Sequence, residues 1–82
     1  MNDMKEVVSK KIDDLHREIK ERTARLQKTV ERVREFVNTA DSYDIVTFLP
    51  REIREIEWER RRIEELEAQA RMLVWMVKEA QE

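Results

Sequence analysis

Apolar side chains recur at steps of three or four residues from Met4 to Val37, and no glycine or proline interrupts them. This spacing places them on one face of an α-helix. Asn2 or Asp3 can cap the free backbone N–H groups at the start. The pattern therefore predicts a helix over about residues 3–38, roughly 54 Å long. The stripe consists of Met4, Val8, Ile12, Leu15, Ile19, Leu26, Val30, Val33 and Val37.

A second helix is expected after the single proline. Pro50 suits the first turn of a helix, and the residue before a proline is pushed away from helical angles. We therefore expect a helix over about residues 50–80, preceded by a partly helical linker at 39–49 in which Asp41 or Ser42 caps a short turn. The second stripe consists of Ile53, Ile56, Ile63, Leu66, Ala70, Leu73, Val77 and Ala80.

The two stripes align in one antiparallel register, in which the numbers of facing residues sum to 89. This register pairs Val33 with Ile56, Leu26 with Ile63, Ile19 with Ala70, and Ile12 with Val77. It also places the polar residues that interrupt both stripes opposite one another, Arg22 facing Glu67 and Thr29 facing Arg60. The chain is therefore predicted to be a single all-α domain, a long antiparallel helical hairpin with a polar layer near its middle.

The polar layer of Arg22, Glu67, Thr29 and Arg60 has two interpretations. Buried polar groups can fix the register and the choice of partner in helical assemblies. Alternatively, polar side chains on facing helices can form a ligand or catalytic site inside a bundle. We favour the first interpretation, because long arginine side chains at such positions usually extend to the edge of the bundle.

The run from Met72 to Val77 is apolar on all sides of the predicted helix. If Leu73 and Val77 face the first helix, then Met72, Trp75 and Met76 point elsewhere and form an exposed apolar patch, which typically marks an interface. Further candidates for contact with a partner are Trp58, because tryptophan is enriched at binding hot spots, and the linker residues Tyr43 and Phe48.

Two helices cover only one side of each other, so a hairpin of this size needs more helix to cover the remaining apolar surface. A second copy of the chain is the simplest source, since two hairpins make a four-helix bundle and two-fold dimers are the commonest oligomers. A larger, different protein is the alternative. Coverage of the C-terminal run by the linker is disfavoured, because the two lie ~35–40 Å apart along the helix.

Charge and composition limit the other partners. The chain has 17 basic and 19 acidic residues and a net charge of -2, which gives no overall attraction to nucleic acid or to an anionic membrane. Its longest apolar run is six residues, against the ~20 that a membrane-spanning helix needs. The N-terminus lacks the apolar core of a signal peptide. We expect a cytoplasmic protein, with a Glu-, Lys- and Arg-rich composition that is typical of thermophiles.

A basic face of the second helix supports an alternative function, nucleic-acid binding. A tryptophan at helical spacing among arginines can stack a base while the guanidinium groups hold phosphates. Acidic residues interleave with this face, and residues 25–62 carry nine basic and eight acidic side chains, so a solvated or protein-contacting face is favoured. The candidate contacts are Arg51, Arg54, Trp58, Arg61 and Arg62.

Enzyme chemistry has no supporting constellation in the sequence. Cysteine and glycine are absent, which excludes thiolate sites and glycine-rich phosphate loops. Asp13 and His16 lie one turn apart and could contribute to a metal site. A single histidine on a charged helix is more often solvated, and that is the interpretation we favour. We predict a non-enzymatic protein with no metal and no cofactor.

Overall fold

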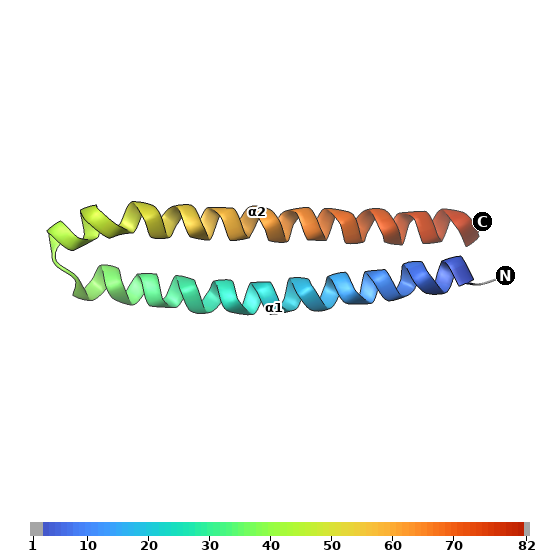
Figure 1. Cartoon of the computed structure of the whole chain (residues 1–82), viewed down its shortest axis with the longest axis horizontal. Coiled ribbons are helices and arrows are strands. Elements are labelled where there is room, and N and C mark those ends of the chain that lie inside the picture. Colours follow the sequence, from blue (N-terminus) through green and yellow to red (C-terminus); the bar gives the residue numbers. More distant parts are fainter. Residues whose placement is uncertain (1–2, 82) are drawn as a thin grey trace.

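The computed structural model describes residues 3–81, which form two long antiparallel helices. Helix α1 spans Asp3–Thr39 and helix α2 spans Ser42–Gln81. The helices lie side by side along their whole length, so that the start of α1 and the end of α2 are at the same end of the molecule (Figure 1). The described residues measure 62 × 15 × 14 Å and include no strand. The predicted all-α helical hairpin is therefore confirmed.

Helix α1 lies close to its predicted bounds, because its apolar stripe continues without a helix breaker. It begins at Asp3, and the first turn carries two acidic residues that favour a helix N-terminus. Asn2, the other capping candidate, lies outside the described residues. At the far end, the Ala40 backbone N–H donates to the Phe36 carbonyl oxygen at 2.8 Å, which extends the helical bonding one residue past Thr39.

Helix α2 begins eight residues earlier than predicted, so the linker expected at 39–49 is wrong. The Asp44 backbone N–H donates to the Asp41 side chain at 2.8 Å, and the Ile45 N–H donates to the Asp41 carbonyl at 3.0 Å. Asp41 is thus the N-cap of α2. It is one of the two capping residues that the sequence predicts, the other being Ser42. Pro50 lies inside the helix and leaves the Val46 carbonyl without its usual donor. The first turns of α2 are inclined to the rest of the helix (Figure 1).

The buried core is small and follows the two predicted stripes. Leu15, Leu66 and Ala70 form its centre, and Ile19 and Leu73 pack against them from the two helices. The buried residues in the described range are Leu15, Val33, Ile63, Leu66 and Ala70. Most other stripe positions are half-buried, whereas Met4, Val37, Ile53 and Ala80 are exposed. Ile53 was predicted to belong to the second stripe, and this is wrong, because its position on α2 is turned well away from α1.

The helices pack in a different register from the one predicted. The ion pairs that cross between helices join Arg22 to Glu59 and Arg32 to Glu52, so that the facing numbers sum to 81 and 84. Relative to the expected sum of 89, α2 is displaced by about one to two turns. The physical reason lies in the connection: a turn of only residues 40–41 holds the helix ends together and leaves no room for an eleven-residue linker.

Candidate interaction surfaces

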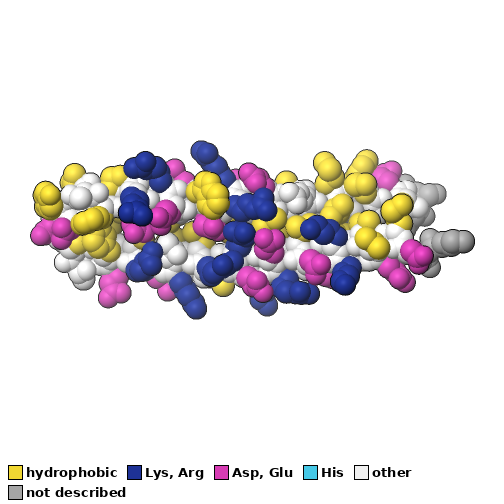
Figure 2. All heavy atoms as spheres, viewed as in Figure 1, with side chains coloured by type: hydrophobic (Ala, Val, Ile, Leu, Met, Phe, Trp, Pro, Cys, Tyr) yellow, Lys and Arg dark blue, Asp and Glu magenta, His cyan; other side chains and the backbone are white. Residues whose placement is uncertain are grey.

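Met72, Trp75 and Met76 form an exposed apolar cluster, here called the outer patch, near the end of α2. Their exposed fractions are 65%, 61% and 50%. Steps of three and one place them on the side of α2 that is turned away from α1. Met4 and Val7 of α1 are also exposed at this end of the hairpin. Hydrophobic side chains gather at this end in Figure 2, beyond the charged middle of the molecule.

A second apolar surface lies at the turn. Tyr43 and Phe48 are both exposed, and Phe48 borders a shallow hollow together with Val33 and Phe36 of α1. Phe48 and Trp75 are 27 residues apart on one helix, a separation of about 40 Å. The residues predicted for a protein interface are therefore exposed as expected, but they belong to separate surfaces at the two ends of the hairpin.

Trp58 is the most exposed aromatic residue in the middle of α2, at 67%. It lines an open hollow with Arg51 and Arg54, and the acidic side chains of Glu55 and Glu59 line the same hollow. Glu55 also pairs with Arg51 at 3.7 Å. The structure thus brings together three of the five residues predicted for nucleic-acid contact, and it places carboxylates among them.

The remaining two arginines of that set lie on the following turn of α2. Arg61 is exposed, and Arg62 donates to the carboxylate of Glu65 at 3.3 Å. Charged side chains of both signs alternate over the middle of the face seen in Figure 2. The basic face is therefore partly neutralised by its own helix, which reduces its attraction for phosphates.

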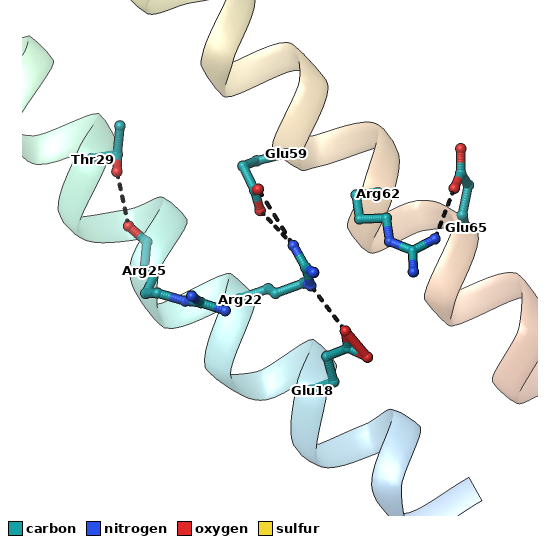
Figure 3. A network of polar contacts seen from close by, with 7 residues as sticks. All are labelled: Glu18, Arg22, Arg25, Thr29, Glu59, Arg62 and Glu65. Carbon is teal, nitrogen blue, oxygen red and sulfur yellow. Dashed lines mark hydrogen bonds and ion pairs between the residues drawn. The ribbon is translucent and has the colours of Figure 1, made fainter. Parts of the chain in front are cut away.

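The predicted polar layer is only partly assembled. Arg22 extends across the hairpin and donates to both carboxylate oxygens of Glu59 at 3.3 and 3.4 Å, and also to Glu18 at 3.3 Å (Figure 3). The expected partner of Arg22 was Glu67, so that pairing is wrong. Arg22 remains half-buried, with 23% of its side chain exposed.

The second expected pair is also wrong. The Thr29 hydroxyl donates to the Arg25 carbonyl within α1 at 3.1 Å, and Arg60 pairs with Glu64 within α2 at 3.4 Å (Figure 3 for Thr29). Sequence reasoning overlooked Glu18 and Glu59 as partners of Arg22. The signal for Glu18 was available, because glutamate four residues before arginine is a favourable helical pair. Glu59 could be found only from the correct register.

Glu67 lies on the opposite side of the hairpin from the ion pairs of Arg22. It lines a shallow hollow with His16 and Ile19 of α1 and with Val74 and Trp75 of its own helix. His16 is exposed, and the described residues include no group of three His, Cys, Asp or Glu side chains that could hold a metal ion. This hollow was not predicted from the sequence, since it depends on how far α2 is displaced along α1.

Comparisons with known proteins give no relative: no protein-family model, no curated protein and no solved structure matches this chain. Neither described helix has a stretch long and apolar enough to cross a lipid bilayer.

Proposed function

We propose that this protein acts through helix–helix contacts with other proteins, as a small assembly or adaptor subunit without enzymatic activity. The observation that carries the proposal is the ratio of buried to exposed apolar side chains. Five apolar residues are buried in the described chain, while twelve large apolar side chains remain exposed. Exposed apolar surface of this extent typically marks a contact site for protein. Further helices packed on the hairpin would cover it.

Self-association is the form of assembly that we favour. Two hairpins packed together make a four-helix bundle, in which every helix has neighbours on two sides. Burial of one large apolar side chain contributes roughly 1.5–3 kcal/mol. A few such residues in each copy would add a substantial fraction of the 5–15 kcal/mol by which typical domains are stable.

The test of this proposal is the mass of the protein in solution, measured by light scattering over a range of concentrations. Circular dichroism on the same samples reports whether the chain is helical. We expect a helical dimer whose helix content falls on dilution, because dissociation removes part of the core. A chain that is fully helical and monomeric at every concentration would contradict self-association.

The outer patch is tested separately with a variant carrying Trp75→Glu and Met76→Glu. A matched control is Ala68→Glu, which adds a charge to an exposed position on the same helix. If the outer patch binds the second copy, the double variant becomes monomeric and the control does not. If the double variant keeps the wild-type mass, the outer patch is available to a different protein.

A second candidate function is nucleic-acid binding, favoured by the hollow that Trp58 shares with Arg51 and Arg54. An exposed aromatic ring beside two guanidinium groups can stack a base and hold its phosphate. Binding to single-stranded DNA and RNA across a salt series tests it, with Arg51→Gln, Arg54→Gln and Trp58→Ala as variants. Affinity that falls with salt and with each substitution supports this function. Absence of binding at low salt excludes it.

A further inference from the structure

The two sides of the hairpin have different chemistry. Viewed down α1, Leu15 and Val33 point at α2, and successive residues turn by about 100°. At this spacing Arg22 and Thr29 lie about 20–40° to one side of the direction in which Leu15 and Val33 point. Ile19 and Val30 lie about 40–60° to the other side. The ion pairs of Arg22 and Arg32 with α2 are formed on the first side, here called the charged side.

Helix α2 repeats this division. Relative to the buried residues Ile63, Leu66 and Ala70, both Ile56 and Val74 are turned by about 50° to one side. In two antiparallel right-handed helices, rotation in the same sense leads to the same side of the pair. The hollow lined by Ile19 and Val74 confirms that these positions share a side. This aliphatic side carries Ile12, Ile19, Val30, Val37, Ile45, Leu49, Ile56 and Val74, most of them half-buried.

We propose that the aliphatic side is covered by a second copy of the chain, with the turns of the two hairpins at opposite ends. This inference rests on the proposed self-association and adds the surface and the orientation. The aliphatic side extends along most of the molecule, whose length is 62 Å and whose width is 15 Å. The outline of the whole side, its length times its width, is about 900 Å². This outline is large enough for a contact that buries the ~800 Å² per partner typical of stable protein interfaces.

A second copy fits this side in length and in pattern. The residues of the aliphatic side occur at intervals along both helices, so their partner needs two helices of similar length with the same spacing. The hairpin itself has those dimensions. The charged side is less suited to the contact, because its ion pairs between Arg22, Glu18 and Glu59 would lose water on burial.

Charge favours opposed turns over turns at the same end. Residues 3–20 and 64–81, the open half of the hairpin, carry seven basic and nine acidic side chains, a net charge of -2. Residues 21–63, the turn half, carry ten basic and nine acidic side chains, a net charge of +1. Opposed turns place each negative half over the positive half of the partner, whereas the same-end arrangement places like charges together.

Glu67 and Arg60 give this orientation a specific contact. Both residues lie towards the aliphatic side of α2, and they are seven residues apart, on either side of the middle of the helix. When α2 of one copy packs antiparallel against α2 of the other, Glu67 comes within about one turn of Arg60 of the second copy. The two-fold symmetry forms this contact twice. The two residues predicted for a polar layer thus meet between copies rather than within one.

The arrangement leaves the two methionines of the outer patch on the outside of the dimer. Met72 and Met76 lie on the side of α2 that is turned away from α1. Trp75 lines the hollow shared by Ile19 and Val74 and therefore lies at the edge of the aliphatic side. A variant carrying Met72→Glu and Met76→Glu is therefore expected to remain a dimer by light scattering, and these two side chains appear once at each end of the assembly.

Disulfide trapping tests the proposed surface and orientation, because the chain has no cysteine of its own. Thr23 is exposed and lies about 80° towards the aliphatic side, close to the middle of α1. With opposed turns, Thr23 of both copies lies within about one turn of the two-fold axis. Thr23→Cys is then expected to form a covalent dimer under mild oxidation. Thr29→Cys, on the charged side of the same helix, is the matched control and is expected to stay uncrosslinked.

Spin labels at Ser9→Cys provide a second measurement, which separates the two orientations. Opposed turns place the two labels about 40 Å apart, and turns at the same end place them about 15 Å apart. A wild-type dimer with the long distance and a crosslink at Thr23→Cys supports the arrangement. A dimer with the short distance, or with a crosslink only at Thr29→Cys, overturns the arrangement and leaves self-association standing. A monomeric wild type overturns both.

Discussion

At the scale of single residues, the hairpin depends on very few side chains. Leu66 is 2% exposed and packs with Leu15 of α1 and Ala70 of α2, whereas most other residues of the two stripes keep part of their surface in water. In a larger domain many buried residues share the stabilisation. Here the loss of one central side chain removes a large part of the core.

Leu66→Ala is expected to reduce the free energy of unfolding by about 2–5 kcal/mol, because it leaves a cavity between the helices. Urea denaturation followed by circular dichroism measures the change. Glu57→Ala on the exposed face is the control and is expected to stay within about 0.5 kcal/mol of wild type. All samples need the same protein concentration, since any association adds to the apparent stability. An unchanged midpoint for Leu66→Ala would contradict the observed core.

The ion pair of Arg22 with Glu59 is the other residue-scale feature that joins the helices. Both side chains are partly exposed, so solvent screens the attraction. A double-mutant cycle with Arg22→Ala and Glu59→Ala is expected to give a coupling energy of about 0.2–1 kcal/mol at low salt. The coupling is expected to decrease in 1 M salt. Equal coupling for Arg22 with Glu67 in a parallel cycle would restore the register predicted from the sequence.

At the scale of the elements, α1 was predictable and the start of α2 was not. The period of the apolar residues and the acidic first turn determine α1 locally, and both are visible in the sequence. Local rules place Pro50 in the first turn of a helix, which is its commonest helical position. The structure instead extends α2 back to the cap at Asp41, with Ile45 and Leu49 half-buried. Their burial is a tertiary effect that local rules do not contain.

For the candidate surfaces, the sequence predicts which residues are exposed but not which residues contact one another between the helices. That Met72, Trp75 and Met76 are exposed follows from the helical period and the position of Leu73, so these residues could be named from the sequence. The partners of Arg22 and the hollow beside Glu67 could not, because both depend on the displacement of one helix along the other. That displacement is set by the length of the connection, for which the sequence predicts residues 39–49 and the structure has residues 40–41.

Pro50→Ala is expected to stabilise the protein by about 1–3 kcal/mol, because alanine supplies an N–H for the Val46 carbonyl and has a high helix propensity. Thermal unfolding and helix content by circular dichroism measure the effect. Pro50→Gly serves as the comparison: it restores the same donor but lacks the helix propensity, so its gain is expected to be smaller. Loss of stability in Pro50→Ala would show that the bend in α2 is itself required for packing.

At the scale of the whole molecule, the hairpin is long and thin, with a radius of gyration of 18.5 Å. A compact chain of 82 residues has a radius of gyration of about 12 Å. The radius of gyration of a dimer therefore reports whether its two copies pack side by side or end to end. Hairpins packed side by side are expected to have a radius of gyration of about 19–20 Å, since their axes are only 8–10 Å apart. Copies joined end to end would exceed about 30 Å. Small-angle scattering distinguishes the two, and the larger value would exclude the aliphatic side as the contact.

The same dimensions affect how the protein behaves on a sizing column. A compact protein with a radius of gyration of 18.5 Å has about 270 residues, more than three times the length of this chain. Calibrated against compact proteins, a single hairpin elutes early and gives too high an apparent mass, because a long thin molecule has a larger hydrodynamic radius than a compact one of the same mass. Elution volume alone therefore does not give the number of chains, which has to be obtained from mass.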